Sequence, residues 1–398
     1  MQWPDREGSL EAFTSEKVPT IISYDGAKRK WGFQIDENEE RHQWFKMDLD
    51  PHHENEISRL TIRYPDPRAL PSVRDGTLGA VTLATDYLTC LRDHAVEILK
   101  LKLGSGVVNT TPLRFIITVP AIWDDAAKSR TQECAVTAGM GNDIRIVTEP
   151  EAAVVHALDI MDLHNLEVGD TFVLCDAGGG TVDLISYNVT CLEPKVEIRE
   201  AVAGSGAACG SIFLNRIFRK YLEEELEDLE GFGEDTIEDA MEDFENITKR
   251  KFTGEEKDVI IRVPGLKDDP SKKIKRQKMT IRGSKLRSLF EPVIASITFL
   301  VQNQLNQTKK AKAVILVGGF GQSSYLRKSI QEVVGNTIEV FQPTHGWTAV
   351  VRGALIKALN EDVPSLSRIT IASRVSRKAY GLRLSIPYKN DIHEEDRK

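Results

Sequence analysis

The sequence predicts an α/β protein of two lobes whose sheets mix parallel and antiparallel strands. Its 398 residues exceed the size at which one hydrophobic core usually stops growing, so two lobes are expected. Apolar runs rich in β-branched residues alternate with helical patterns along the chain, which is typical of α/β folds. A glycine turn at 178–180 joins two apolar runs, and such a hairpin adds an antiparallel pair to the sheet.

The first half of the chain alternates strands and helices. Short strands are expected within 18–35, around the turn at Gly26. A helix is expected over 72–103, because apolar residues recur on one of its faces, and a buried strand over 113–120 ends at a proline. The remaining predicted elements are a helix from Asp124 to Gly139, a strand over 144–147 and a helix with Pro150 in its first turn.

The second half starts with the glycine hairpin and continues the same alternation. Strands are expected over 196–202, 259–263, 278–281 and 313–317. Helices are expected over 207–228, 234–252, 284–307 and 348–360.

Composition and charge exclude several classes of function. The net charge of −8 and the isoelectric point near 5.7 argue against nucleic acid as the main partner. Five cysteines without a Cys-x-x-Cys pair predict neither a zinc site nor disulfides, and favour a reducing compartment. The N-terminus lacks the apolar region of a secretory signal, and no run is long enough to cross a membrane.

We therefore expect a cytoplasmic monomer that binds neither nucleic acid nor membranes. The basic run at 272–278 leaves a nuclear location open, because such runs serve as import signals. An exposed strand explains the same run at least as well.

The glycine turn is flanked by two carboxylates, Asp176 and Asp183. Glycines let the backbone approach a ligand closely, and successive amides in such a turn suit phosphate oxygens. A carboxylate beside phosphate needs a cation between them, which suggests Mg²⁺ held through water, and Thr181 adds a hydroxyl. An ordinary hairpin explains the same residues, so the run alone leaves both interpretations open.

A second glycine turn, from Gly318 to Gly321, also follows an apolar strand and precedes a helix. Its amides and the hydroxyls of Ser323 and Ser324 either meet a ligand or cap that helix, and the cap is the simpler interpretation. The chain has no Gly-x-x-x-x-Gly-Lys-Ser/Thr run, which excludes a P-loop, and no fingerprint for dinucleotides.

Several motifs occur in an order that resembles a known family. They are 115–123, the region of Gly139, 146–153, 176–183 and Gly318-Gly319. This order resembles the nucleotide-binding domain of the 70-kDa heat-shock protein family, over most of 18–360. The resemblance implies a two-lobed actin-like ATPase fold, related to ribonuclease H, with mixed sheets and a central nucleotide cleft. It divides the chain into 1–170 (lobe I), 171–360 (lobe II, with the phosphate and adenosine loops) and 361–398, the start of an incomplete C-terminal region.

The resemblance also implies the residues that act on the phosphates. Asp176 resembles the carboxylate that orients the attacking water, and together with Glu149 it would hold Mg²⁺ through water. Thr181 joins these two as a catalytic residue. Lys46 resembles a phosphate-contacting lysine, although a surface lysine is the commoner case. The loop for the β- and γ-phosphates matches Gly178, Gly179 and Gly180.

Further residues are implied to hold the rest of ATP or ADP. Gly210 resembles a glycine that faces the phosphates or the ribose. Glu245, Lys249 and Arg250 resemble the helix residues that hold adenosine, with a spacing that departs from the usual by one residue. Gly318 and Gly319 resemble the adenosine turn, and Gln322 stands where the family has an arginine that stacks on adenine.

Two departures bear on activity. The chain starts past the place where the family's first phosphate-binding hairpin should end, and stops at Lys398, before a substrate-binding domain would be complete. We expect an ATP-binding, chaperone-like protein whose lobes close on nucleotide, with weak or no ATP hydrolysis to ADP and phosphate, acting with protein clients or co-chaperones. The alternatives are a non-catalytic pseudo-ATPase that acts through protein contacts and a phosphotransferase for small molecules.

Overall fold

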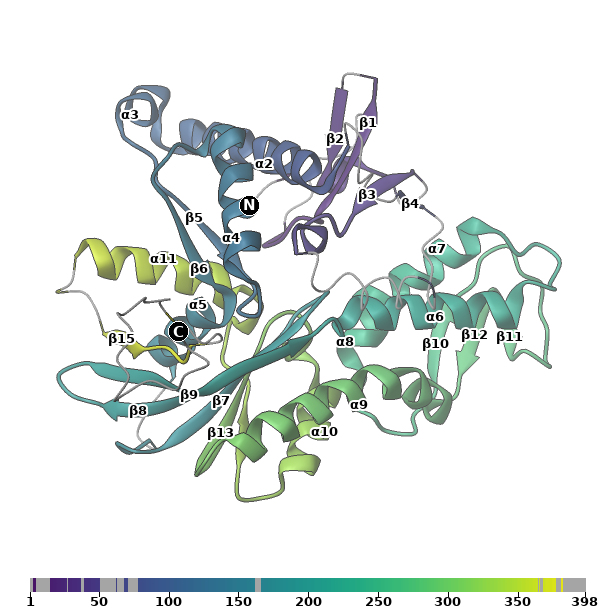
Figure 1. Cartoon of the computed structure of the whole chain (residues 1–398). Helices are drawn as coiled ribbons and strands as arrows, with labels where there is room; N and C mark the ends of the chain where they lie inside the picture. Colours follow the sequence, from purple (N-terminus) through teal and green to yellow (C-terminus); the bar gives the residue numbers. More distant parts are fainter. Residues whose placement is uncertain are drawn as a thin grey trace, which may run out of the picture.

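Two packed helices lie between the sheets of the protein (Figure 1). The computed structural model describes residues 3–4, 15–26, 28–36, 39–50, 62, 68–70, 78–161, 166–363, 365, 368–376 and 381. The helices are α5 (Glu149–Ile160) and α11 (Ala349–Asp362), which pack directly on each other. A parallel pair of strands, β5 and β6, lies on one side of them, and a six-stranded sheet lies on the other.

Lobe I carries a four-stranded sheet and the parallel pair. The four-stranded sheet has the order β2-β1-β3-β4, formed by Lys28–Trp31, Ile21–Asp25, Arg41–Gln43 and Ala69–Leu70. The pair consists of β5 (Phe115–Val119) and β6 (Ile144–Thr148). The helices of this lobe are α2 (Ala80–Leu103), α3 (Ser105–Thr110) and α4 (Asp125–Ala135).

The ends of α4 follow local sequence signals. The carboxylate of Asp124 accepts a hydrogen bond from the amide of Ala127 at 2.8 Å, which satisfies one of the free donors of the first turn. One turn of π-helix (Val136–Met140) follows, in which Gly139 takes a left-handed φ of 79°.

The six-stranded sheet of lobe II has the order β14-β13-β7-β8-β9-β15. Its antiparallel part is β7 (Thr171–Ala177), β8 (Val182–Cys191) and β9 (Val196–Ala207). β13 (Ala311–Val317) and β14 (Glu339–Phe341) continue the sheet in parallel beyond β7, and β15 (Ile369–Ser373) runs parallel to β9. The sheet is therefore mixed, as predicted.

Alternate residues of the central strands face opposite hydrophobic clusters. On β7, Phe172 and Leu174 join the cluster with α5 and α11, whereas Val173 and Cys175 join the cluster on the other face. That second face is covered by α6 (Ser211–Leu226), α9 (Gly283–Gln307) and α10 (Ser324–Val334). Because both faces are buried, these strands appear in the sequence as continuous apolar runs.

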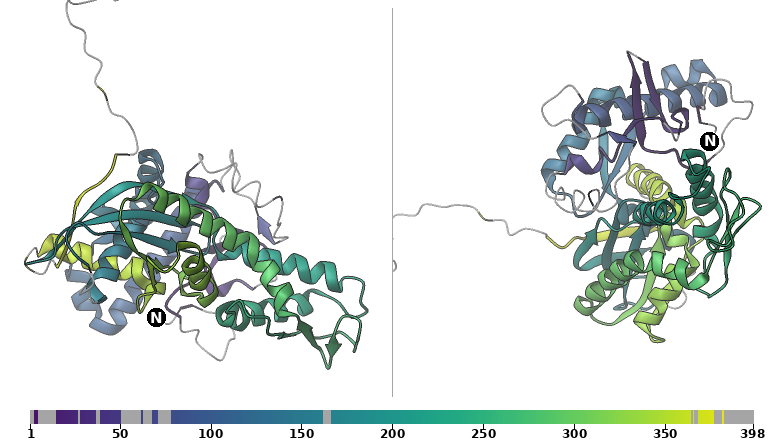
Figure 2. Two further views of the ribbon diagram at one scale, coloured as in Figure 1. Left: turned by 90° about the horizontal axis from the view of Figure 1, so that it is seen from below. Right: turned by 90° about the vertical axis from the view of Figure 1, so that its right-hand side faces the viewer.

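A smaller unit extends from lobe II (Figures 1 and 2). It contains α7 (Glu234–Asp243), one turn of π-helix (Phe244–Thr248) and the short α8 (Lys249–Lys251). Its sheet has the order β10-β12-β11, formed by Val259–Arg262, Lys278–Ile281 and Ile274–Lys275. The basic run at 272–278 lies on this exposed hairpin, as the strand interpretation predicts.

The structure confirms most of the predicted elements and changes a few. β9 extends to Ala207, so the helix expected over 207–228 begins only at Ser211. The first residues of the helix predicted over 72–103 lie partly outside the described residues. The prediction missed β3, β4, β11, β14 and β15, which are short or depend on a partner strand. Our division of the chain at residues 170 and 360 stays a prediction, but β15 extends the lobe II sheet beyond 360, since the edge of β9 offers free backbone groups there.

The five cysteines, Cys90, Cys134, Cys175, Cys191 and Cys209, are free thiols. Among the described residues, no helix combines the length and the apolar character needed to cross a membrane.

Candidate functional site

Asp176 and Asp183 lie directly opposite each other in the hairpin of β7 and β8. Both are buried, with 8% and 2% of their surface exposed. The turn between the strands is closed by a hydrogen bond from the Gly178 amide to the Thr181 carbonyl, 2.9 Å long. The local sequence therefore brings two carboxyl groups and three glycines to one end of the sheet.

The buried pair has unusual protonation. Burial raises the pKa of Asp176 to about 7, and the negative charge of Glu149 adds to this effect. Burial raises the pKa of Asp183 to about 8, Glu149 and Asp176 add to it, and a hydrogen bond from Thr181 opposes it. Oδ1 of Asp183 is buried and has no hydrogen-bond partner among the described residues. Strongly shifted carboxyl groups of this kind are typical of functional sites.

Lobe I contributes Glu149 and two cations. Glu149 is the first residue of α5, and its carboxylate forms an ion pair with Lys46. Lys17 lies in the field of Asp176 and Glu149, whose charges raise its pKa, but desolvation is the larger effect and the pKa is lowered overall. Although Lys17 is exposed as a residue, its Nζ lies 4.8 Å from the centre of the Trp347 ring.

The glycine loop is seated on the N-terminus of α6. The amides of Gly210, Ser211 and Ile212 donate to the carbonyls of Gly180, Gly178 and Gly179, at 3.1, 3.2 and 3.0 Å. A Cβ on Gly210 would lie 2.2 Å from the Gly179 carbonyl oxygen, so only glycine allows this contact. The loop carbonyls thus satisfy the first turn of α6, while the amides of Gly179 and Gly180 donate no hydrogen bond within the described residues.

The second glycine turn lies beside the first, because β13 pairs with β7. Gly318 has a φ of 87°, and a Cβ there would lie 2.4 Å from both the Ala177 carbonyl oxygen and Oδ1 of Asp176. Ser323 caps α10 by accepting a hydrogen bond from the Leu326 amide at 3.3 Å, which confirms the cap interpretation for this serine. Two turns separated by about 140 residues of sequence therefore form one surface.

Glu245 and Lys249 form an ion pair that also includes Asn215 of α6. The Asn215 amide donates to Glu245 at 2.7 Å, and Lys249 donates to Asn215 at 2.9 Å. Burial lowers the pKa of Lys249, while Glu245 opposes this shift. Glu245 lies within the π-helical turn and Lys249 directly follows it, and the wider hydrogen-bonding ring of such a turn takes up one extra residue. The turn therefore lies where the spacing of these residues departs from the expected one.

Arg250, Gly319 and Gln322 meet around Gly346 and Trp347. The Arg250 guanidinium lies 5.7 Å from the centre of the Trp347 ring. A Cβ on Gly319 would lie 3.3 Å from the same ring, and a Cβ on Gly346 would lie 2.4 Å from Nε2 of Gln322. The amide of Gly318 donates to the Gly346 carbonyl at 3.0 Å, which ties this group to the glycine turn.

For four residues of the site, no role is predicted from the sequence: Lys17, Asp183, Asn215 and Trp347. Asp183 was visible as a flanking carboxylate, and its pairing with Asp176 follows from the hairpin register. Lys17, Asn215 and Trp347 have no local signal, because the partners in these contacts lie 30 or more residues away in the chain.

The residues fit a magnesium ion that keeps its water. Within the described residues, no three His, Cys, Asp or Glu side chains are close enough to hold a metal directly. Asp176 and Glu149 are nevertheless close enough to influence each other's charge, and the unpartnered Oδ1 of Asp183 is a ready acceptor for a bound water.

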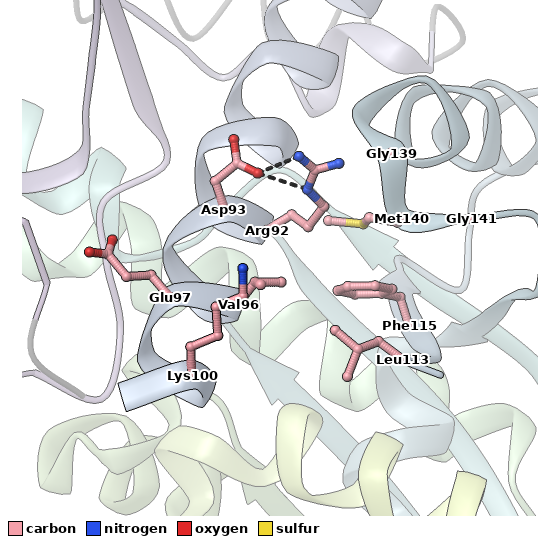
Figure 3. Close-up of a pocket in the computed structure, with 10 residues that line it drawn as sticks. All are labelled: Arg92, Asp93, Val96, Glu97, Lys100, Leu113, Phe115, Gly139, Met140 and Gly141. Carbon is pink, nitrogen blue, oxygen red and sulfur yellow. Dashed lines mark hydrogen bonds and ion pairs between the residues drawn. The ribbon is translucent and has the colours of Figure 1, made fainter. Parts of the chain in front are cut away.

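A cavity of about 580 Å³ lies elsewhere in lobe I (Figure 3). It opens between α2, β5 and the turn after α4, with Val96, Phe115 and Met140 forming apolar walls and the Arg92–Asp93 ion pair at its edge. None of the predicted site residues lines it, so it is separate from the carboxylate site.

Known proteins match between 38% and 91% of this chain. The family model described as Hsp70 protein matches residues 73–360. Heat shock 70 kDa protein 12A of Homo sapiens is 24% identical, covering 91% of this chain and 66% of that protein. Chaperone protein DnaK of Nitrosopumilus maritimus is 27% identical over 64% of this chain and 39% of its own length. A chaperone protein HscA homolog of Neisseria meningitidis is 34% identical over 38% of this chain and 22% of its own length. The chain thus spans less than two thirds of each of these relatives.

Proposed function

The chain belongs to the Hsp70 family, and from this we propose that it is an ATP-dependent, chaperone-like switch with slow turnover. Family membership supports an actin-like ATPase fold and nucleotide binding. The proposal of a switch with slow turnover rests on one observation. The buried pair Asp176 and Asp183 lies at a glycine loop, and a second glycine turn lies next to this loop. This geometry supports a site for a phosphate chain and its cation.

At the phosphate end we assign distinct roles to the residues. The amides of Gly179 and Gly180 face the phosphate oxygens, since they donate no hydrogen bond within the described residues. Asp176 orients the attacking water, and Thr181 and Lys46 contact the γ-phosphate. Mg²⁺, held through water by Asp176 and Glu149, would neutralise phosphate charge, which is a large part of catalysis in phosphoryl transfer.

The raised pKa of Asp176, about 7, suits a group that accepts a proton near neutral pH. Because of this raised pKa, a large fraction of the Asp176 carboxyl groups is protonated near neutral pH, until a bound cation stabilises the carboxylate. Turnover in the absence of bound cation should therefore be negligible.

At the other end, the ion pair of Glu245 and Lys249 and the turn at Gly318 and Gly319 hold the adenosine. Glu245 and Lys249 are held rigidly by Asn215. Arg250 and Gln322 border the same region.

Lobe closure is proposed from contacts that already cross between the lobes. Trp44 of lobe I packs edge-on against Phe213 of α6, with ring centres 5.2 Å apart, and Arg216 lies 4.4 Å from the Trp44 ring. Arg68 and Glu234 form an ion pair at 3.5 Å. Small contacts of this kind can form and break as a ligand closes the cleft.

A non-catalytic module is the second candidate. Lys46 and Lys17 already supply positive charge beside Glu149 and Asp176, so the carboxylates are partly balanced without any metal. A protein of this kind would bind nucleotide without hydrolysing it and act through protein contacts.

The deciding experiment is calorimetric titration of the 398-residue chain with ATP, with and without Mg²⁺. We expect magnesium-dependent binding, and thermal stabilisation of roughly 2.7 kcal/mol at about 100 times Kd. Absence of binding by the folded protein would overturn the proposal.

Hydrolysis is tested with Asp176→Asn. We expect the variant to lose ATP hydrolysis while it remains folded, because amide and carboxyl have the same shape. Thr190→Ala, an exchange at the far end of the same sheet, serves as the control with unchanged turnover. Parental phosphate release by Asp176→Asn would show that the catalytic assignment is wrong, and no release by the parent would favour the non-catalytic module. Release without an added acceptor would argue against a phosphotransferase.

A further inference from the structure

Trp347 is a large aromatic residue that takes no part in the cores. It belongs to none of the five hydrophobic clusters formed by the described residues, and it is half-buried. An indole usually contributes to a core through its large apolar area. Its placement outside every cluster therefore calls for another role.

Three separate segments meet at the Trp347 ring. Gly319 of the second glycine turn leaves room for it, since a Cβ there would approach the ring to 3.3 Å. Arg250 approaches at 5.7 Å from the smaller unit, and Lys17 at 4.8 Å from the N-terminal segment. The face of an aromatic ring attracts cations through its quadrupole. Two positively charged side chains, Lys17 and Arg250, therefore lie near the Trp347 ring.

The second glycine turn connects the Trp347 ring with the carboxylates. A Cβ on Gly318 would lie 2.4 Å from Oδ1 of Asp176 and from the Ala177 carbonyl oxygen, whereas a Cβ on Gly319, the next residue, would lie 3.3 Å from the Trp347 ring. Lys17 lies over the ring and also in the field of Asp176 and Glu149. An elongated anion with a flat end would therefore find the carboxylates and their cation at one end and an aromatic surface at the other, with Lys17 close to both.

We propose that the Trp347 ring is the surface on which the base of the bound nucleotide stacks, with the Arg250 guanidinium on the base's opposite face. The inference rests on the proposed nucleotide site and assigns to it a residue that determines affinity. Two contacts of about 3.5 Å each need about 7 Å between the layers. Arg250, whose side chain is exposed, moves outward by a small distance to admit the base.

Stacking of this kind gives affinity but little choice between bases, because every base presents a π-face. Trp347 should therefore contribute equally to ATP and to GTP, and not at all to a ligand that lacks a base. This pattern separates a stacking surface from a residue that merely supports the fold.

The test measures the affinity of the full chain for Mg-ATP, Mg-GTP and magnesium tripolyphosphate by calorimetry, for the parent, Trp347→Leu and Trp347→Phe. Leucine keeps apolar bulk but removes the flat ring, and phenylalanine restores a ring. For Trp347→Leu we expect Kd for both nucleotides to rise about tenfold or more, with Kd for tripolyphosphate unchanged. Trp347→Phe should recover most of the loss.

The outcomes separate the two proposals. If the parent binds ATP and Trp347→Leu binds it equally well or more tightly, the stacking inference is wrong and the nucleotide site stands. Equal losses for ATP and tripolyphosphate would also overturn it, because they would indicate damage to the phosphate end. If the folded parent binds none of the three ligands, the proposed function itself fails.

Discussion

At the residue scale, the site depends on carboxyl groups whose negative charge is disfavoured by burial. Asp176 and Asp183 are both buried, which raises the pKa of each; the charge of Glu149 raises both pKa values further, and the charge of Asp176 adds to the shift at Asp183. Proteins accept such unfavourable burial at sites where a ligand later compensates it. The resulting cost of ionisation can be measured in the ligand-free protein.

The first prediction concerns pH and stability. The pKa values of Asp176 and Asp183 are raised to about 7 and about 8, above the ordinary value near 4. Between pH 4 and pH 8 the native state therefore binds more protons than the unfolded state, so stability falls as pH rises through this window. Denaturant unfolding in chelator-containing buffer should show this decline.

Asp183→Asn is the control for that measurement. The amide cannot ionise, so the decline should become shallower in the variant. A parent whose stability is flat or rising over this window would contradict the raised pKa values.

The second prediction concerns the glycines around the loop. Gly210→Ala places a Cβ 2.2 Å from the Gly179 carbonyl, and the backbone must shift to relieve the clash. We expect a loss of about 1–3 kcal/mol in the free energy of unfolding. Urea denaturation measures it.

Gly179→Ala is the matched control, because its Cβ would meet nothing within 4 Å. It should leave stability within about 0.5 kcal/mol of the parent and weaken nucleotide binding, since the new methyl group hinders close approach of phosphate. Equal destabilisation by both variants would contradict the packing described for Gly210.

At the scale of elements, the π-helical turn decides how α7 and α8 present the site residues. It contains Glu245 and ends directly before Lys249, and it allows their ion pair. Turns of this kind are often found at functional sites. Asn215 of α6 joins the turn to the rest of lobe II through hydrogen bonds to both charged groups.

The third prediction therefore concerns Asn215→Ala. Lys249, which is buried, loses one acceptor, and leaving a buried donor without a partner costs about 1–3 kcal/mol. Asn246→Ala makes the same chemical change at an exposed position of the same turn and should cost less than about 0.5 kcal/mol. Chemical denaturation of both variants compares them, and similar losses would indicate that Asn215 does not support Lys249.

At the scale of the whole molecule, one contact between the lobes is aromatic, in addition to the packing of α5 on α11. Trp44 belongs to lobe I but packs against the lobe II cluster, and its φ of 70° is rare for a bulky residue. Such backbone strain persists only where surrounding contacts compensate it. The packing of Trp44 on Phe213 and Arg216 provides that compensation.

The fourth prediction is that Trp44→Ala opens the ligand-free cleft. Aromatic pairs contribute about 0.5–1.5 kcal/mol beyond their buried area, enough to shift a closed–open equilibrium several-fold. The radius of gyration from small-angle X-ray scattering should increase. Trp44→Phe keeps an aromatic contact and should have the radius of gyration of the parent. An unchanged radius of gyration for Trp44→Ala would show that the Trp44 contact does not hold the lobes together.

Sequence patterns were sufficient for the regular elements. The apolar runs of β7 and β13 are buried on both faces, and their hydrophobicity is therefore visible without a partner. Asp124 and Ser323 act as helix caps through bonds to residues three positions away, so local sequence specifies them. Short strands such as β14 and β15 carry too few residues for a pattern and form because an edge strand offers them hydrogen bonds.

The sequence by itself determined the fold class, the glycine hairpin with its two carboxylates and, through the order of its motifs, the family. These are local properties, or properties of order along the chain. Only the tertiary structure decided that the two glycine turns touch, that Gly210 seats the loop and that Lys17, Arg250 and Trp347 converge. These contacts form because β13 pairs with β7 and because segments that are distant in the sequence pack together. The residue types alone do not reveal which distant segment the fold places beside them.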